Sequence, residues 1–70
     1  MISEETVRSV LGGPEQHFFV RVGRVVVQSR LKRTGKTYLI RVFVDIDRHP
    51  AEVITVYITS KTSKYWRNEP

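Results

Sequence analysis

The sequence predicts an α+β fold in which one N-terminal helix packs on a four-stranded antiparallel meander sheet. Three observations lead to this prediction. A short amphipathic stretch precedes Gly12-Gly13-Pro14, a sequence typical of helix ends. Four runs rich in β-branched and aromatic residues follow it. The connections between these runs are so short that neighbouring strands are expected to run antiparallel.

The helix is predicted over Ile2–Leu11. Ser3 is suited to cap its first turn, and Glu4 and Glu5 place negative charge where it complements the helix dipole. Its apolar stripe consists of Val7, Val10 and Leu11. Because an isolated helix of this length is unstable in water, we expect it to cover one face of the sheet and to leave the other face open.

Four strands are predicted, over His17–Val22, Arg24–Lys32, Thr37–Asp47 and Val53–Thr59. Gly23 marks a tight reversal, the sequence from Arg33 to Lys36 a hairpin turn, and that from Asp47 to Pro50 a longer turn. No internal repeat or linker indicates a second domain, so residues 1–70 are expected to form a single domain.

Alternation along the strands separates an aliphatic face from a basic face. On the third strand, Ile40, Val42 and Val44 share the first face, and Arg41, Phe43 and Asp45 share the second. From the first two strands we expect the basic face to contain His17, Phe19, Arg21, Arg24, Val26, Gln28, Arg30 and Lys32. The aliphatic face is expected to contain Phe18, Val20, Val22, Val25, Val27 and Leu31. A one-residue bulge at Gly23 would reverse one of these sets.

The composition favours a polyanionic partner. The 70 residues include 12 Lys and Arg and seven Asp and Glu, which gives a net charge of +5 and a pI of about 10.1. The chain has no cysteine and two histidines, so neither a disulfide nor a structural zinc site is expected, and no metal or cofactor is predicted. No apolar run approaches a membrane span, and we expect a cytoplasmic protein without membrane contact. A core this small would gain burial in a homodimer.

One pattern of residues resembles a known family. It consists of Ile2-Ser3-Glu4-Glu5 with Val7, Val10, Leu11 and Pro14, then the runs from Tyr38 to Asp45 and from Val53 to Lys61. The pattern, which spans about Ile2 to Tyr65, resembles small uncharacterised prokaryotic domains related in fold to the RelE/ParE toxins. Those domains usually carry an extra helix, with a His and one or two Arg, before the Ile-Ser dipeptide. Because this chain begins at Met1-Ile2-Ser3, we expect that helix and its polar side chains to be missing.

The resemblance implies a RelE-like sheet and an activity on messenger RNA. RelE-like ribonucleases cleave messenger RNA on the ribosome, without a metal, using basic and tyrosine side chains. The matching positions here are Arg41, Tyr57, Lys61, Lys64 and Tyr65. If the chain is an enzyme, the resemblance thus implies a metal-independent endoribonuclease with Arg41, Tyr57, Lys61 and Tyr65 as candidate catalytic residues. Cations would stabilise the charge of the transition state, and an acid or base would act on the ribose hydroxyl or the leaving oxygen.

Three functions stay open on this basis. The first is RNA binding, in which Phe43 and Tyr57 contact bases and phosphates meet the cations Arg24, Arg30, Lys32, Arg41, Lys61 and Lys64. The second is a degenerate RelE-like toxin. The third is a non-catalytic interaction module, of the toxin–antitoxin type or a homo-oligomer, which binds an acidic partner such as a cognate inhibitor.

Each singled-out side chain also has a purely structural interpretation. Arg41 is as well suited to pairing with Asp45, or with a neighbouring strand, as to binding phosphate. For Tyr57 we favour packing against Phe43. For Tyr65 and Trp66 we favour attachment to the domain or a dimer contact over base stacking, and for His17 a structural or merely exposed position.

Overall fold

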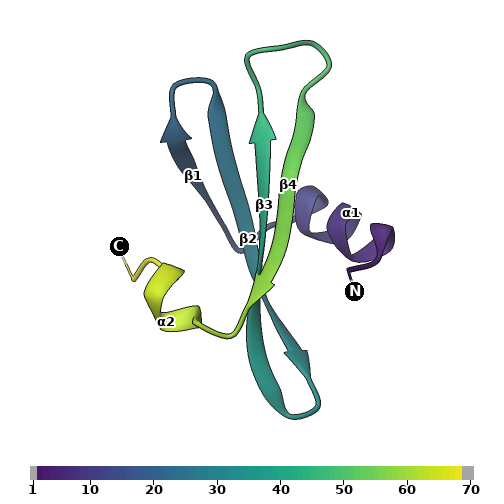
Figure 1. Ribbon diagram of the computed structural model, residues 1–70, viewed down its shortest axis with the longest axis vertical. Coiled ribbons are helices and arrows are strands. Elements are labelled where there is room, and N and C mark those ends of the chain that lie inside the picture. Colours follow the sequence, from purple (N-terminus) through teal and green to yellow (C-terminus); the bar gives the residue numbers. More distant parts are fainter. Residues whose placement is uncertain (1, 69–70) are drawn as a thin grey trace.

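The computed structural model, which describes residues 2–68, is a single antiparallel sheet with one helix on each side (Figure 1). The elements follow the chain as α1 (Glu4–Gly12), β1 (Gln16–Arg21), β2 (Arg24–Arg33), β3 (Lys36–Asp45), β4 (Glu52–Thr59) and α2 (Thr62–Tyr65). The strands lie in the order β1-β2-β3-β4. The predicted α+β class, with an N-terminal helix and a four-stranded antiparallel meander, is therefore confirmed, whereas the short helix α2 was not predicted.

Helix α1 begins as the sequence indicates. The Ser3 side chain accepts a hydrogen bond from the backbone N–H of Thr6 at 3.1 Å, and two acidic residues occupy the first turn. The helix covers the aliphatic face, where Val10 is buried against Ile40, Val42 and Val44. Partly buried neighbours complete this core: Ile2, Val7, Val25, Val27, Val56 and Ile58. Burial of this apolar surface holds the short helix in place.

The two tight turns use residues with positive φ. Thr34 and Gly35 have φ values of 49° and 74°, and Arg33 pairs with Lys36 across them. Positive φ at both central positions is the signature of the type I′ hairpin turn, which suits the twist of paired strands. Gly23, with φ 84°, turns the chain between β1 and β2, and its carbonyl accepts a hydrogen bond from Ile46 N–H at 2.9 Å.

The faces predicted for His17, Phe18 and Phe19 in β1 are wrong, whereas Arg21 lies on the basic face as predicted. His17, Phe18 and Phe19 pair with Val27, Val26 and Val25, and the register shifts before Arg21 pairs with Arg24. Directly paired residues share a face, so Phe18 lies on the basic face, and His17 and Phe19 lie on the aliphatic face. The bulge lies within β1, at Val20, and not at Gly23. Val20 and Val22, which we expected in the core, are 50% and 92% exposed.

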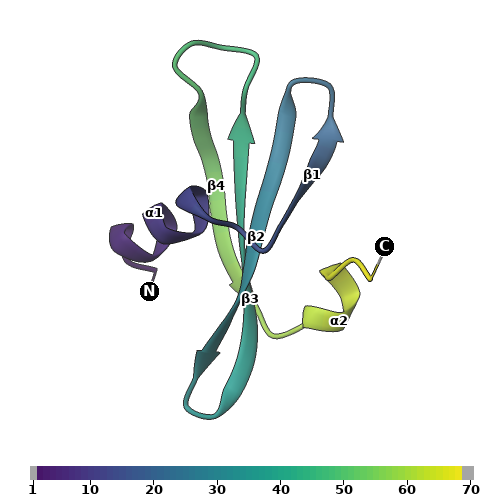
Figure 2. The same cartoon turned by 180° about the vertical axis from the view of Figure 1, so that it is seen from behind.

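The basic face is covered at its centre, contrary to the expected open surface. Val26, Gln28 and Leu39 are fully buried there, and Arg41 is 8% exposed. The cover is the C-terminal segment, residues 61–68, which contains α2 and lies on the side of the sheet opposite α1 (Figures 1 and 2). Among the described residues, neither helix is long and apolar enough to cross a membrane.

Candidate nucleic-acid interface

Arg41 is the centre of a polar and aromatic cluster, the Arg41 cluster, formed with the buried Gln28 and the partly buried Phe43, Tyr57 and Tyr65. The register places Arg41 directly between Gln28 on β2 and Tyr57 on β4. Its guanidinium donates to Gln28 Oε1 and to Tyr57 Oη, each at 2.8 Å. The guanidinium carbon lies 4.4 Å from the ring centre of Tyr65 and 5.2 Å from that of Phe43. Arg41 therefore pairs with both neighbouring strands, and not with Asp45.

The aromatic residues of this cluster pack against one another. The rings of Phe43 and Tyr57 are stacked, with centres 6.1 Å apart, and Tyr65 meets Tyr57 edge to face at 6.5 Å. Both geometries are favourable for ring pairs. The structural interpretations of Tyr57, as packing against Phe43, and of Tyr65, as attachment to the domain, are thereby confirmed.

Hydrogen bonds from Gln28 and Gln16 attach the C-terminal segment to the sheet. Gln28 Nε2 donates to Gln16 Oε1 at 2.8 Å and to the Tyr65 carbonyl at 3.2 Å. Gln16 Oε1 also accepts from Arg67 N–H at 3.2 Å, and the Arg67 guanidinium lies 3.8 Å from the ring centre of Phe18. Because an unpaired buried amide is costly, these contacts favour one position of the segment.

Arg30 is neutralised within the chain. Its Nε and Nη2 donate to the two carboxylate oxygens of Glu15 at 3.1 and 3.0 Å, and its guanidinium lies 4.4 Å from the ring centre of Trp66. The hydrogen bonds from the Arg30 side chain and backbone lower the pKa of Glu15 below its ordinary value. Trp66 is thus held against the domain, as we favoured.

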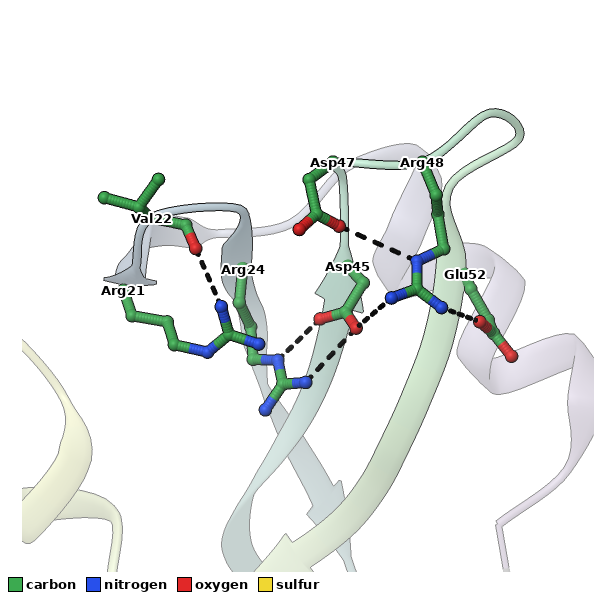
Figure 3. Close-up of polar contacts among 7 residues, drawn as sticks. All are labelled: Arg21, Val22, Arg24, Asp45, Asp47, Arg48 and Glu52. Carbon is green, nitrogen blue, oxygen red and sulfur yellow. Dashed lines mark hydrogen bonds and ion pairs between the residues drawn. The ribbon is translucent and has the colours of Figure 1, made fainter.

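Arg24 is neutralised at the opposite end of the sheet, in an ion-pair network around Asp45 (Figure 3). Asp45 is 3% exposed and accepts two hydrogen bonds from Arg24, and Arg48 lies 3.4 Å away. Arg48 also pairs with Glu52 at 2.8 Å and Asp47 at 3.6 Å. The Arg24 hydrogen bonds, followed by the charges of Arg24 and Arg48, hold the pKa of Asp45 below its ordinary value.

A different group of cations is exposed and has no carboxylate within ion-pair distance among residues 2–68. Of its seven members, Arg21 lies at the end of β1 and Arg67 lies against the ring of Phe18. The other five, which we call the free-cation surface, are Lys32, Arg33, Lys36, Lys61 and Lys64. Three of these residues lie at the β2–β3 hairpin, and two lie in the C-terminal segment. Both places are in the lower half of Figure 1. Among the described residues, every exposed cation without an ion pair except Arg21 therefore lies on the β2–β3 hairpin or in the C-terminal segment.

An open hollow lies between strands β2 and β3 and the C-terminal part of the chain. It measures about 560 Å³, and its lining includes Thr37 from β3, and Ser60, Ser63 and Trp66 from the C-terminal part of the chain. Hydroxyl groups beside lysines are suited to hydrogen-bond phosphate oxygens. This end of the molecule can thus accept an extended polyanion.

The candidate catalytic residues are only partly brought together. Arg41, Tyr57 and Tyr65 belong to one cluster, whereas Lys61 precedes α2, and its backbone N–H donates to Thr59 Oγ1 at 3.0 Å. Among the described residues, no group of three or more His, Cys, Asp or Glu side chains could hold a metal ion.

Sequence reasoning missed Arg33 and Lys36 as candidate contacts, because they were assigned to a turn. The signal was present: the segment from Arg30 to Tyr38 contains four cations and no acidic residue. Arg24 and Arg30 form ion pairs with Asp45 and Glu15, which are distant from them in the chain. Alternation along a single strand does not reveal such pairs.

No protein-family model, curated protein or solved structure matches this chain.

Proposed function

We propose that this protein binds nucleic acid by contacts between its free-cation surface and the phosphate backbone. The observation that carries the proposal is the separation of the cations. Arg8, Arg24, Arg30 and Arg48 are paired with carboxylates, whereas Lys32, Arg33, Lys36, Lys61 and Lys64 are exposed at one end of the molecule. Arg21 is exposed at the other end and has no ion pair within residues 2–68. Of the residues predicted to bind RNA, Lys32, Lys61 and Lys64 belong to this surface. Arg41 is excluded from it by burial, and Arg24 and Arg30 by their ion pairs.

The expected strength of binding follows from counterion release. Each lysine or arginine that neutralises a phosphate releases a condensed counterion, so affinity falls as salt rises. Five such contacts would lower the affinity about 100-fold or more between roughly 50 and 200 mM salt. Binding of this kind is independent of sequence and applies to RNA, the ligand predicted from the sequence, and to DNA.

Fluorescence anisotropy with labelled oligonucleotides tests the proposal. The variant Lys61→Gln/Lys64→Gln removes two charges from the free-cation surface. The control Arg8→Gln/Arg21→Gln also removes two charges, from exposed residues outside it. We expect the first variant to lose at least tenfold in affinity at about 50 mM salt and the control to lose much less. Equal losses would show that only net charge matters, and absence of binding by the wild type would overturn the proposal.

The proposal is for binding without RelE-type cleavage. Arg41 and Tyr57, two of the candidate catalytic residues, hydrogen-bond each other and lie in contact with the ring of Tyr65. A ribose-phosphate chain would have to displace this ring to reach them. Incubation of the protein with the RNA probe, followed by gel electrophoresis, is expected to return the intact probe, and shortened products would contradict this part of the proposal.

A second candidate function is self-association through β1, which accords with the interaction module considered above. β1 is an edge strand, and it ends in an apolar surface of Phe19, Val20 and Val22, of which Phe19 is 66% exposed. A second copy could pair with this edge and cover these side chains. Sedimentation equilibrium would then show a dimer that the variant Phe19→Lys abolishes, and a monomer at all concentrations would rule it out.

A further inference from the structure

The β2–β3 hairpin extends beyond the rest of the sheet as a two-stranded ribbon. β4 ends at Thr59, which pairs with Leu39, and β1 begins at Gln16, which pairs with Gln28. Past these points only β2 and β3 remain paired, through Leu31↔Tyr38, Lys32↔Thr37 and Arg33↔Lys36. Figure 1 shows this ribbon, residues 31–38, projecting at the bottom, away from both helices.

The dimensions of the ribbon match those of the major groove of B-form DNA. Three residue pairs at about 3.4 Å per residue give the ribbon a reach of roughly 10 Å, and its strands are about 4.8 Å apart. The major groove is about 12 Å wide and 8.5 Å deep, and it admits a two-stranded β-ribbon. The major groove of A-form RNA is deep and too narrow for side chains to read. The geometry therefore favours a DNA duplex over an RNA duplex.

The cations of the ribbon are distributed over both of its faces. Lys32 and Thr37 pair directly and share the face on which α2 lies, whereas Arg33 and Lys36 share the face on which α1 lies. A ribbon inside a groove has one phosphate strand on each side. Cations on both faces of the ribbon are therefore suited to contact both phosphate strands of a groove. Contact with a single nucleic-acid strand would need cations on one face only.

The turn at the tip is narrow. Thr34 and Gly35 form it, and both have positive φ, so the chain reverses over two small residues. Thr37, at the base of the ribbon, lines an open hollow together with Ser60 and Ser63, which are the chain neighbours of Lys61 and Lys64. A phosphate strand that borders the groove can run along this hollow.

We propose that the β2–β3 ribbon binds in the major groove of double-stranded DNA, with Lys32, Arg33 and Lys36 on the flanking phosphates. This inference rests on the proposed nucleic-acid binding and names its substrate class. The ribbon supplies the cations, and the C-terminal segment supplies a second contact with the backbone.

The first test compares three labelled probes of equal length, a DNA duplex, an RNA duplex and a single DNA strand, with the full chain. We expect the DNA duplex to bind at least tenfold more tightly than the other two. The variant Lys32→Gln/Arg33→Gln/Lys36→Gln should remove this preference. It should also reduce the slope of log K against log salt by roughly 2.7, which corresponds to about 0.9 for each lost contact. Its circular dichroism and thermal midpoint should match those of the wild type, because all three residues are exposed.

The second test uses the wild-type protein alone, so it does not depend on the folding of a variant. Methyl green, which occupies the major groove, should compete with the protein for the DNA duplex, whereas netropsin, which occupies the minor groove, should not. Equal binding of all probes, or competition by netropsin alone, would overturn the ribbon inference and leave the proposed nucleic-acid binding intact. Failure of every probe to bind would overturn both.

Discussion

Asp45 links the β1–β2 turn to the β3–β4 loop. It is buried, and its carboxylate accepts from Arg24 on β2 and lies close to Arg48 in the loop (Figure 3). Replacement by Asn removes the charge that both arginines face. We expect Asp45→Asn to lower the midpoint of thermal unfolding by roughly 10 °C, because hydrogen bonds to charged groups are stronger than neutral ones.

Asp47→Asn is the matched control for this change, since Asp47 is exposed and lies 3.6 Å from Arg48 alone. We expect it to leave the midpoint nearly unchanged, as is usual for exposed pairs. Circular dichroism melts of both variants measure the difference. Equal midpoints for the two variants would show that the network around Asp45 is not stabilising.

The same carboxylates predict the response of stability to acid. The pKa of Asp45 lies below its ordinary 3.8 in the folded protein, and the pKa of Glu15 lies below 4.5, because each accepts hydrogen bonds from an arginine. As the pH falls, the unfolded chain therefore takes up protons at these groups before the folded protein does. Their contribution to stability is complete above the unfolded-state pKa values and is lost as the pH falls through the folded ones.

The thermal midpoint should thus fall once the pH drops below about 4.5, and should fall less in Asp45→Asn, in which one titrating group is missing. Melts at about pH 6, 5, 4 and 3 measure the trend. A midpoint that is the same at pH 3 as at pH 6 would contradict the assigned direction of both pKa shifts.

Gly23 and Gly35 allow the cost of backbone strain from a side chain to be distinguished from the cost of a steric clash. Both have positive φ, so alanine is strained at either position by about 1–2 kcal/mol. A Cβ at Gly23 would also lie 2.7 Å from Asp47 Oδ2, whereas a Cβ at Gly35 would meet nothing within 4 Å. We expect Gly23→Ala to cost more free energy of unfolding than Gly35→Ala in urea titrations, and the reverse order would contradict the close approach of Asp47.

The stability of helix α2 depends on its tertiary contacts. Its four residues are too few for a stable helix, and Tyr65 attaches it to Arg41 and Tyr57. We expect Tyr65→Ala to lower the free energy of unfolding by about 2 kcal/mol, since it removes a partly buried ring and a cation–π contact. Tyr65→Phe keeps the ring and should stay within about 0.5 kcal/mol of the wild type in the same urea titration. Equal stability of Tyr65→Ala and wild type would mean that the segment is not held by this ring.

The elements that were predicted well are those whose signals are local. Strands β2 and β3 alternate regularly, and the Thr34-Gly35 turn fixes their register, so Arg41 was placed on the correct face. The faces of His17, Phe18 and Phe19 in β1 were misassigned because a bulge around Val20 shifts the alternation of the strand. No residue type near Val20 indicates a bulge in the sequence. Helix α2 was missed because its four residues, Thr62–Tyr65, carry no helical apolar pattern.

In the molecule as a whole, the positive sign of the surface charge was predicted from the sequence, but the location of the unpaired cations was not. Net charge and alternation pointed to the basic face as a whole. Pairing between Arg24 and Asp45, and between Arg30 and Glu15, then neutralises part of that face. These pairs join residues 21 and 15 positions apart in the chain. Among the described residues, the exposed cations that remain unpaired lie on the ribbon and the C-terminal segment, except for Arg21 at the end of β1.

We infer that nucleic acid binds at the end of the molecule formed by the ribbon and the C-terminal segment. The most direct measurement is a titration of the ¹⁵N-labelled protein with a short DNA duplex, followed by two-dimensional amide NMR at about 50 mM salt. We expect shifts to concentrate in residues 31–38 and 60–64, with little change in β1 or at Asp45. Shifts confined to β1, or no shifts at saturating duplex, would contradict it.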